Sequence, residues 1–345
     1  MSPDDPGILR RRAGRGFTYI SPAGRRITAE RTLERIRAIV IPPAWTDVWI
    51  CPDPNGHIQA VGNDARGRRQ YRYHPAFRAR RDRAKFDRLI RFGKALPRIR
   101  RQVRADLRRH GLPRPKVLAA VVRLLELTRL RVGNQEYARL NRSFGLSTLR
   151  ERHATVSGAT IHFRFRGKGG RAVERSFVDR GLAAVVRRCQ DLPGQALFQY
   201  LDEAGEPQAI SSEDVNAYLR DAAGSEEFSA KDFRTWTATL ATFLAIRSAE
   251  AAQPGDRAPS KSTVDEAVRT AAADLGNTTA VTRASYVHPA VLRLPGGEDV
   301  RSRRPDTLPT RRDELALLAA LRAAGATRSQ AQKARLRQRP AGRAA

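Results

Sequence analysis

The strongest constraint on the fold is a run of strict alternation near the middle of the chain. Residues 161–166 read IHFRFR, so that apolar and polar side chains alternate with the period of a β-strand. A GKGG turn follows at 167–170, and residues 172–178 alternate again on its far side. The pattern predicts a β-hairpin within residues 154–178, with Lys168 at its tip.

Most of the surrounding sequence has helical spacing instead. Residues 116–130 form an apolar segment that must be buried as a helix. Helices are also expected in the following segments: 78–110, 180–190, 212–222, 231–249, 263–275 and 312–323. The fold class is therefore predicted to be α+β, with a mainly helical larger domain that carries the hairpin as a small sheet.

The N-terminal part has a different pattern. Residues 17–20 and 45–51 are typical of strands, and Asn55-Gly56 predicts a tight turn to a partner strand at 57–62. A small β-rich domain is expected at 1–77, with residues 1–16 as a flexible arm. The larger domain is expected at 78–345, with residues 324–345 as a disordered basic tail.

The charge indicates a polyanionic partner. The chain has 65 Lys and Arg against 35 Asp and Glu, a net charge of +30. Such an excess favours binding to nucleic acid, and duplex DNA has the densest charge of the common partners. RNA and anionic membrane surfaces are also compatible with this net charge. Part of the arginine excess is typical of a GC-rich genome.

Several chemistries lack their motifs. The sequence contains no Walker A loop, dinucleotide fingerprint, HExxH helix or acidic cluster for two metal ions, so neither a nucleotide nor a metal cofactor is expected. Cys51 and Cys189 are expected to be reduced thiols. No stretch is long and apolar enough for a membrane span, and the expected location is the cytoplasm, at the nucleoid.

Cationic side chains and a protein nucleophile would suit phosphoryl chemistry without a metal. Arg131 follows the apolar helix directly, and Lys168 has glycine on both sides. Arg234 lies in a KDFRTW segment. Each also has an ordinary explanation: a surface arginine at a helix end, a basic turn, and a capped amphipathic helix.

The segment GNTTAVTRASYVHP, residues 276–289, holds two further candidates. Asn277 lies at a helix boundary, where capping is the usual role of asparagine. Tyr286 follows a short helix and precedes Pro289, and an isolated tyrosine in such a place most often packs in a core.

Taken together, these segments resemble the type IB DNA topoisomerases, in their compact bacterial and poxvirus-like branch. The resemblance covers about residues 17–295. It rests on five motifs that occur in order: LRVGNQEYAR, FGLSTLR, FRFRGKGG, KDFRTW and LGNTTAVTRASYVHP.

The resemblance implies a role for each candidate. Tyr286 would be the nucleophile that forms a 3′-phosphotyrosine, Arg131 and Arg234 the catalytic arginines, and Lys168 the general acid. Asn277 stands where many relatives have histidine. It can donate a hydrogen bond to a phosphoryl oxygen, but it cannot take a charge or act as an acid or base.

The implied activity is relaxation of positive and negative supercoils without ATP or metal. The enzyme would be a bacterial monomer that clamps duplex DNA, preferentially supercoiled. The N-terminal segment GRRQYRY resembles the part of the family that contacts the major groove. Gln70 would read a base edge, and the expected contacts also include Arg68, Arg69, Tyr71 and Tyr73.

Two other functions stay open. A tyrosine recombinase or integrase would share the catalytic set, but that class typically has histidine where Asp232 stands, and it lacks a segment like residues 17–73. A DNA-binding protein with an inactive site is the second alternative, although every candidate catalytic group is present.

Overall fold

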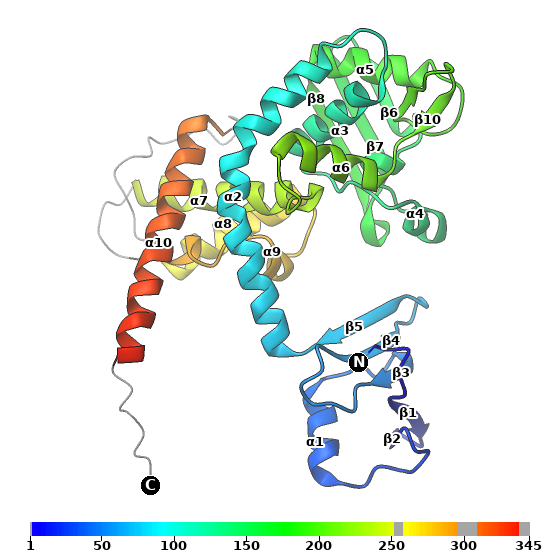
Figure 1. Ribbon diagram of the computed structural model, residues 1–345, viewed down its shortest axis with the longest axis vertical. Helices are drawn as coiled ribbons and strands as arrows, with labels where there is room; N and C mark the ends of the chain where they lie inside the picture. The colour runs from blue at the N-terminus through cyan, green and yellow to red at the C-terminus, as the bar shows by residue number, and fades with distance from the viewer. Residues whose placement is uncertain (1, 252–257, 295–308, 338–345) are drawn as a thin grey trace. The chain divides into compact units, whose positions relative to one another are not determined.

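The computed structural model describes residues 2–251, 258–294 and 309–337 (Figure 1). The chain divides into two compact units, Met1–Lys85 and Phe86–Ala345. The division falls inside one continuous helix, α2 (Pro75–Leu107), and not between residues 77 and 78 as expected. Composition does not mark this boundary because the helix crosses it without interruption.

The first unit is built on a five-stranded antiparallel sheet in the order β2-β1-β3-β4-β5. The helix α1 (Glu30–Ala38) contributes Ile36 to the core of this unit, where it joins Val48, Ile50 and Ala60. The strands are β1 (Ile8–Ala13), β2 (Gly16–Ile20), β3 (Thr46–Ile50), β4 (Ile58–Asn63) and β5 (Arg69–Tyr73).

The expected flexible arm at 1–16 is wrong. Residues Ile8–Ala13 form β1, which pairs with both β2 and β3. Ile8 is buried, and the guanidinium of Arg10 lies 4.1 Å from the ring centroid of Phe17 and donates to the carbonyl of Trp45. An arginine-rich segment can therefore be an ordered strand when its neighbours supply ring faces and carbonyls.

The second unit carries a three-stranded antiparallel sheet in the order β6-β7-β8. The strands are β6 (Ala154–Ser157), β7 (Thr160–Arg166) and β8 (Ala172–Val178). The pairing of β7 with β8 confirms the predicted hairpin. Gly158, with φ of 56°, turns the chain between β6 and β7 and so adds a third strand.

Helices make up most of the second unit, which confirms the α+β class. They are α3 (Arg114–Thr128), α4 (Gln135–Asn141), α5 (Arg180–Gln190), α6 (Ser212–Ala223), α7 (Ala230–Ala251), α8 (Lys261–Leu275), α9 (Thr279–Ser285) and α10 (Arg311–Arg337). A small ribbon of β9 (Gln199–Leu201) and β10 (Pro207–Ala209) lies between α5 and α6 in the sequence.

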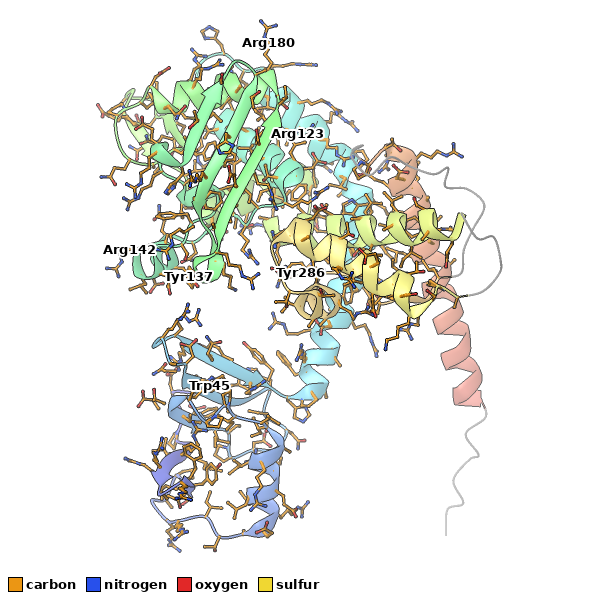
Figure 2. All side chains as sticks on the ribbon, turned by 180° about the vertical axis from the view of Figure 1, so that it is seen from behind. Trp45, Arg123, Tyr137, Arg142, Arg180 and Tyr286 are labelled. Atoms are coloured by element: carbon orange, nitrogen blue, oxygen red, sulfur yellow. The ribbon has the colours of Figure 1, made fainter. Side chains whose placement is uncertain are left out.

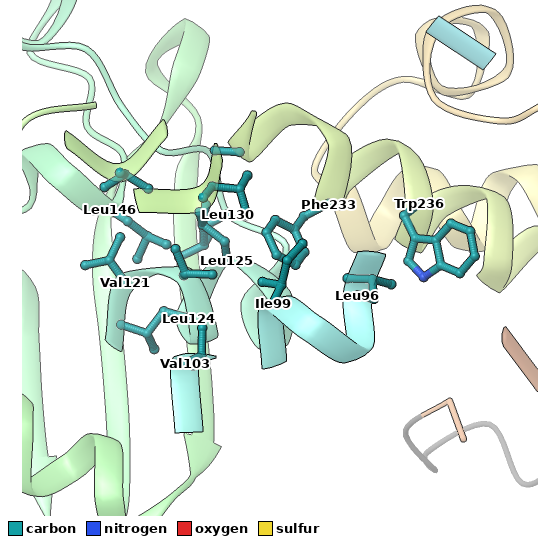
Figure 3. Packing of buried hydrophobic residues seen from close by; sticks show 14 of the residues in the cluster. Leu96, Ile99, Val103, Val121, Leu124, Leu125, Leu130, Leu146, Phe233 and Trp236 are labelled. Carbon is teal, nitrogen blue, oxygen red and sulfur yellow. The ribbon is translucent and has the colours of Figure 1, made fainter. Parts of the chain in front are cut away.

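Buried side chains of α2, α3 and α7 pack together in the core of this unit (Figure 3). Leu96 and Ile99 of α2 lie near Phe233 of α7 in that view. A Cβ atom at Gly93 would lie 2.3 Å from the indole of Trp236, so α2 needs glycine where it meets this side chain. This packing places the first turn of α7 beside the end of α3.

The C-terminal helix is longer than expected. It was predicted over 312–323, with a disordered tail after it, but α10 continues to Arg337. Leu317, Leu318 and Leu321 are buried against the core of the second unit. Residues 338–345 of the predicted tail lie outside the described residues. No described helix has both the length and the apolar character that a membrane span requires.

Candidate active site

Four of the five predicted catalytic residues line one cavity of the second unit. They are Arg131, Lys168, Arg234 and Tyr286, and the cavity has a volume of about 490 Å³. They come from four separate parts of the chain: the loop after α3, the tip of the β7–β8 hairpin, the first turns of α7, and the end of α9 (Tyr286 is labelled in Figure 2).

Arg131 is held by the chain segment that follows α3. Its carbonyl accepts a hydrogen bond from the Leu146 amide at 2.9 Å. Gly133 has φ of 106°, and a Cβ atom at Gly145 would lie 2.6 Å from the Gly133 Cα. The glycines of two separate motifs therefore allow a close backbone approach that fixes the loop on which Arg131 stands.

Arg234 is buried, with 4% of its surface exposed. Its guanidinium donates to the carbonyl of Arg129 at the end of α3 and to the carbonyl of Leu275, at 2.9 Å, at the end of α8. Burial, reinforced by the charge of Arg131, lowers the pKa of Arg234 to about 10. The group still carries its charge at neutral pH, in a fixed orientation.

Tyr286 ends the short helix α9 and is half-buried. Its carbonyl accepts from the hydroxyl of Thr239 on α7, and the guanidinium carbon of Arg234 lies 5.4 Å from its ring centroid. Burial acts to raise the pKa of Tyr286. The positive charges of Arg234, Arg131 and Lys231 outweigh burial, so that the pKa lies below its ordinary value. The cavity therefore stabilises the phenolate, the nucleophilic form, relative to that of a tyrosine in water.

Lys168 is exposed at the hairpin tip, where Gly169 and Gly170 both have φ of 78°. The hairpin is tied to the end of α8 by two arginines of its second strand and turn. Arg175 donates to the Asp274 carbonyl at 3.0 Å, and Arg171 donates to the Gly276 carbonyl at 3.2 Å. These bonds hold the hairpin beside the end of α8, and the exposed Lys168 lines the cavity from the hairpin tip.

Asn277 is linked to the cavity through Arg131. Its Oδ1 accepts from the guanidinium of Arg131 at 2.6 Å, and Asn277 is not among the residues that line the cavity. Its Nδ2 is buried without a hydrogen-bond partner in the described structure. A buried amide donor left unpaired costs free energy, and a phosphoryl oxygen could satisfy it.

Sequence reasoning missed two contributors. Lys231 lines the cavity and stands one helical turn before Arg234, and this i, i+3 spacing could have identified it. The end of α8 is the second. The carbonyls of Asp274, Leu275 and Gly276 accept from Arg175, Arg234 and Arg171, which suits the negative end of a helix dipole. Nothing in the local sequence indicates this junction.

Asp232 has a structural role at the start of α7. Its carboxylate accepts from the Ser229 amide at 2.9 Å and from Arg88 at 3.2 Å. It therefore acts at the third position of the capping interaction and not as the cap itself. Cys51 and Cys189 are buried thiols that form no disulfide. In the described part of the chain, no group of three or more His, Cys, Asp or Glu residues is placed to hold a metal ion.

The predicted DNA-contacting residues lie in the first unit, on and beside β5. This strand is at the edge of the sheet, and its side chains alternate between two faces. Arg69, Tyr71 and Tyr73 are exposed on one face, with the two tyrosine rings 6.1 Å apart. Gln70 points to the other face and donates to Asp64 at 3.0 Å.

Arg68 is not free for DNA in this arrangement. It forms an ion pair with Asp64 at 2.6 Å, and this bond helps to hold the pKa of the Asp64 carboxyl well below its usual range. The structure therefore groups Arg69 with the two tyrosines and separates them from Arg68 and Gln70.

Comparisons with known proteins identify both parts of the chain. Residues 74–293 match the family model of the eukaryotic DNA topoisomerase I catalytic core. Residues 16–64 match that of the bacterial DNA topoisomerase IB N-terminal domain.

A curated relative extends the match. DNA topoisomerase 1B of Acanthamoeba polyphaga mimivirus is 33% identical over 293 residues, which are 84% of this chain and 87% of the relative. Among solved structures, the XerH site-specific recombinase bound to its difH substrate gives a TM-score of 0.34 at 12% identity, over 56% of this chain and 49% of the recombinase.

The core match covers more than half of the chain, and the curated relative exceeds 30% identity over most of both sequences. The chain therefore belongs to the type IB DNA topoisomerase family and is a DNA topoisomerase.

Proposed function

We propose that Tyr286 is the nucleophile of this topoisomerase. The observation that carries the proposal is the convergence of Tyr286, Arg131, Arg234 and Lys168 on one cavity. The phenolic oxygen attacks a DNA phosphodiester in line, and the new bond is a 3′-phosphotyrosine. Because the intermediate keeps the energy of the broken bond, the strand is resealed without ATP.

Arg131 and Arg234 stabilise the negative charge that develops on the nonbridging oxygens. The donors of Arg234 and Arg131 are already oriented by carbonyl and amide partners, so little reorganisation is needed when that charge forms. Asn277 donates from its unpaired Nδ2. Lys168 gives a proton to the departing 5′ oxygen, and its exposed position at the hairpin tip suits a group that approaches the leaving group from outside.

The exposed face of β5 holds the duplex through Arg69, Tyr71 and Tyr73. Gln70 reads a base edge once its side chain leaves Asp64. The enzyme acts as a monomer on supercoiled DNA of either sign, in the bacterial cytoplasm at the nucleoid. The net charge of +30 and the two buried thiols that form no disulfide support this setting.

Trapping the covalent intermediate tests the proposal. Wild-type protein mixed with end-labelled duplex and quenched with denaturant should give a protein–DNA adduct in EDTA without ATP. The same sample should relax positive and negative supercoils. Tyr286→Phe should lose the adduct by about 10⁴-fold or more, while duplex affinity stays near that of the wild type.

An adduct at full yield in Tyr286→Phe would assign the nucleophile elsewhere. A strict requirement for a divalent metal would remove the mechanism. Activity found only in a multimer on paired sites would favour a recombinase, and absence of any adduct would favour an inactive DNA-binding protein.

A further inference from the structure

A second cavity of the same unit is larger than the one at Tyr286, with a volume of about 640 Å³. The helix α4 contributes to both. Its N-cap Asn134 and Tyr137 line the catalytic cavity, whereas Arg139 and Arg142 line the second. Figure 2 labels Tyr137 and Arg142 at α4. The cavities also share Phe144, so one aromatic side chain belongs to both walls.

The second cavity lies beside the end of β7 that β6 does not reach. β6 begins at Ala154, opposite Phe163, so β7 has no strand neighbour on that side from Arg164 to Arg166. The chain at Phe144 takes that place through its amide, which donates to the Arg166 carbonyl at 2.7 Å.

Arginine side chains dominate the lining of this cavity. The arginines are Arg139, Arg142, Arg150, Arg152, Arg164 and Arg166. The remaining lining residues are aromatic or small: Ala138, Phe144, His153, Phe165 and Ala172. No carboxylate is among the lining residues, and none of the six arginines forms an ion pair in the described part of the chain. The cross-strand neighbour of Arg164 is Glu174, which instead contacts His162 at 3.3 Å.

His153 neither adds to the positive charge of these arginines nor offsets it. Burial, together with the charges of Arg152 and Arg150, lowers the pKa of His153. Its ring packs against Phe144 with centroids 4.5 Å apart, and its Nδ1 accepts from the Arg150 amide at 3.0 Å. The imidazole is therefore an uncharged part of the wall. Arginines gathered in a concave space without counter-charge repel one another, and a bound anion would remove that repulsion.

We propose that this cavity binds a polyphosphate anion, either inorganic polyphosphate or the triphosphate of a nucleotide. Phosphates joined directly through anhydride oxygens bring several charges into one small volume. Phosphates along a DNA strand are separated by sugars and present fewer charges to a space of this size. Five of the six arginines are exposed, and Arg150 is partly buried, so their side chains can reach a bound anion. Arginine forks bind paired phosphate oxygens directly. The site uses side-chain cations and needs no glycine-rich phosphate loop, which explains why nucleotide motifs in the sequence do not indicate it.

The test is calorimetric titration of the full chain with sodium tripolyphosphate and, separately, with ATP, in EDTA at physiological ionic strength. One saturable site is expected. The double variant Arg152→Ala/Arg164→Ala should bind at least about tenfold more weakly, because each lost charge-assisted hydrogen bond contributes roughly this factor or more. Higher affinity for tripolyphosphate would identify the inorganic chain as the ligand, and higher affinity for ATP would identify the nucleotide.

The matched control is Arg180→Ala/Arg322→Ala, which removes two exposed arginines of α5 and α10 from the same unit. Its affinity should stay within about twofold of the wild type. The variant Arg152→Lys/Arg164→Lys keeps the charge and should bind with intermediate affinity, which gives a second comparison if the alanine variant does not fold.

Three outcomes would overturn the proposal. The first is that neither probe binds saturably to the wild type. The second is that the control variant loses as much polyphosphate affinity as the cavity variant. The third is that Arg152→Ala/Arg164→Ala keeps its polyphosphate affinity but binds duplex DNA more weakly. The last would make the cavity a part of the DNA-binding surface.

Discussion

Arg234 at the catalytic cavity is 4% exposed and donates to two main-chain carbonyls, whereas Arg69 on β5 is exposed and lies 5.9 Å from the ring centroid of Tyr71. The same guanidinium group is fixed in one unit and free to adapt in the other. Burial of Arg234 opposes its charge, as the lowered pKa shows. Such a cost is tolerated where a cation must already be in position when charge develops.

The exposed arginine and tyrosines of β5 are not held in one orientation in this way. Their side chains can follow the shape of a duplex, which suits affinity more than catalysis. We therefore expect substitutions at the catalytic cavity to change the rate of the chemical step and substitutions on β5 to change binding. The following predictions test this division, from the largest expected effect to the smallest.

Lys168→Ala should slow cleavage of ordinary DNA by about 10²–10⁴-fold, the usual contribution of a general acid. The defect should shrink sharply on DNA whose 5′ bridging oxygen is replaced by sulfur, because a thiolate leaves without a proton. Single-turnover cleavage of the two substrates measures the difference. Arg131→Ala is the comparison, and sulfur should rescue it less. Equal defects of Lys168→Ala on both substrates would exclude proton donation as its main role.

Asn277→Ala should slow cleavage by about 10²-fold, the usual effect of losing one donor to transition-state charge. The variant removes both the free Nδ2 donor and the Oδ1 that holds Arg131. Asn277→His restores a donor and should recover most of the rate. Single-turnover cleavage at saturating enzyme checks both variants. A wild-type rate in Asn277→Ala would show that the unpaired amide has no role in the reaction.

Lys231→Met should slow cleavage several-fold at neutral pH, and the difference should narrow as pH rises. Lys231 is one of the cations that lower the pKa of Tyr286, so its removal raises that pKa and leaves less phenolate at a given pH. The pH dependence of single-turnover cleavage should shift toward higher pH. Spectroscopic titration against a Tyr286→Phe background isolates this tyrosine. An unshifted titration would show that Lys231 acts on the DNA and not on the nucleophile.

Arg69→Ala should weaken duplex binding by a similar factor for all sequences, and the slope of log affinity against log salt should fall by about 1. Gln70→Ala is the neighbouring control, because its side chain lies on the opposite face of β5. It should change sequence preference instead. Binding isotherms at several salt concentrations on two duplexes separate these effects. A slower chemical step in Arg69→Ala at saturating DNA would contradict the division of roles between the catalytic cavity and β5.

The sequence alone determined the secondary structure where local patterns are strong. Alternation in IHFRFR and the GKGG turn predicted the β7–β8 hairpin, and the apolar run at 116–130 predicted α3, because each pattern depends on one element and its solvent boundary. Ordered motifs also indicated the family and named Tyr286, Arg131, Lys168 and Arg234, which converge on one cavity.

Only the tertiary structure decided which of these groups meet and how each is held. Local sequence does not indicate that Arg10 would order β1, or that three arginines would converge on the carbonyls at the end of α8. These contacts join residues far apart in the chain or depend on strand register, and both arise only when the chain packs into its cores.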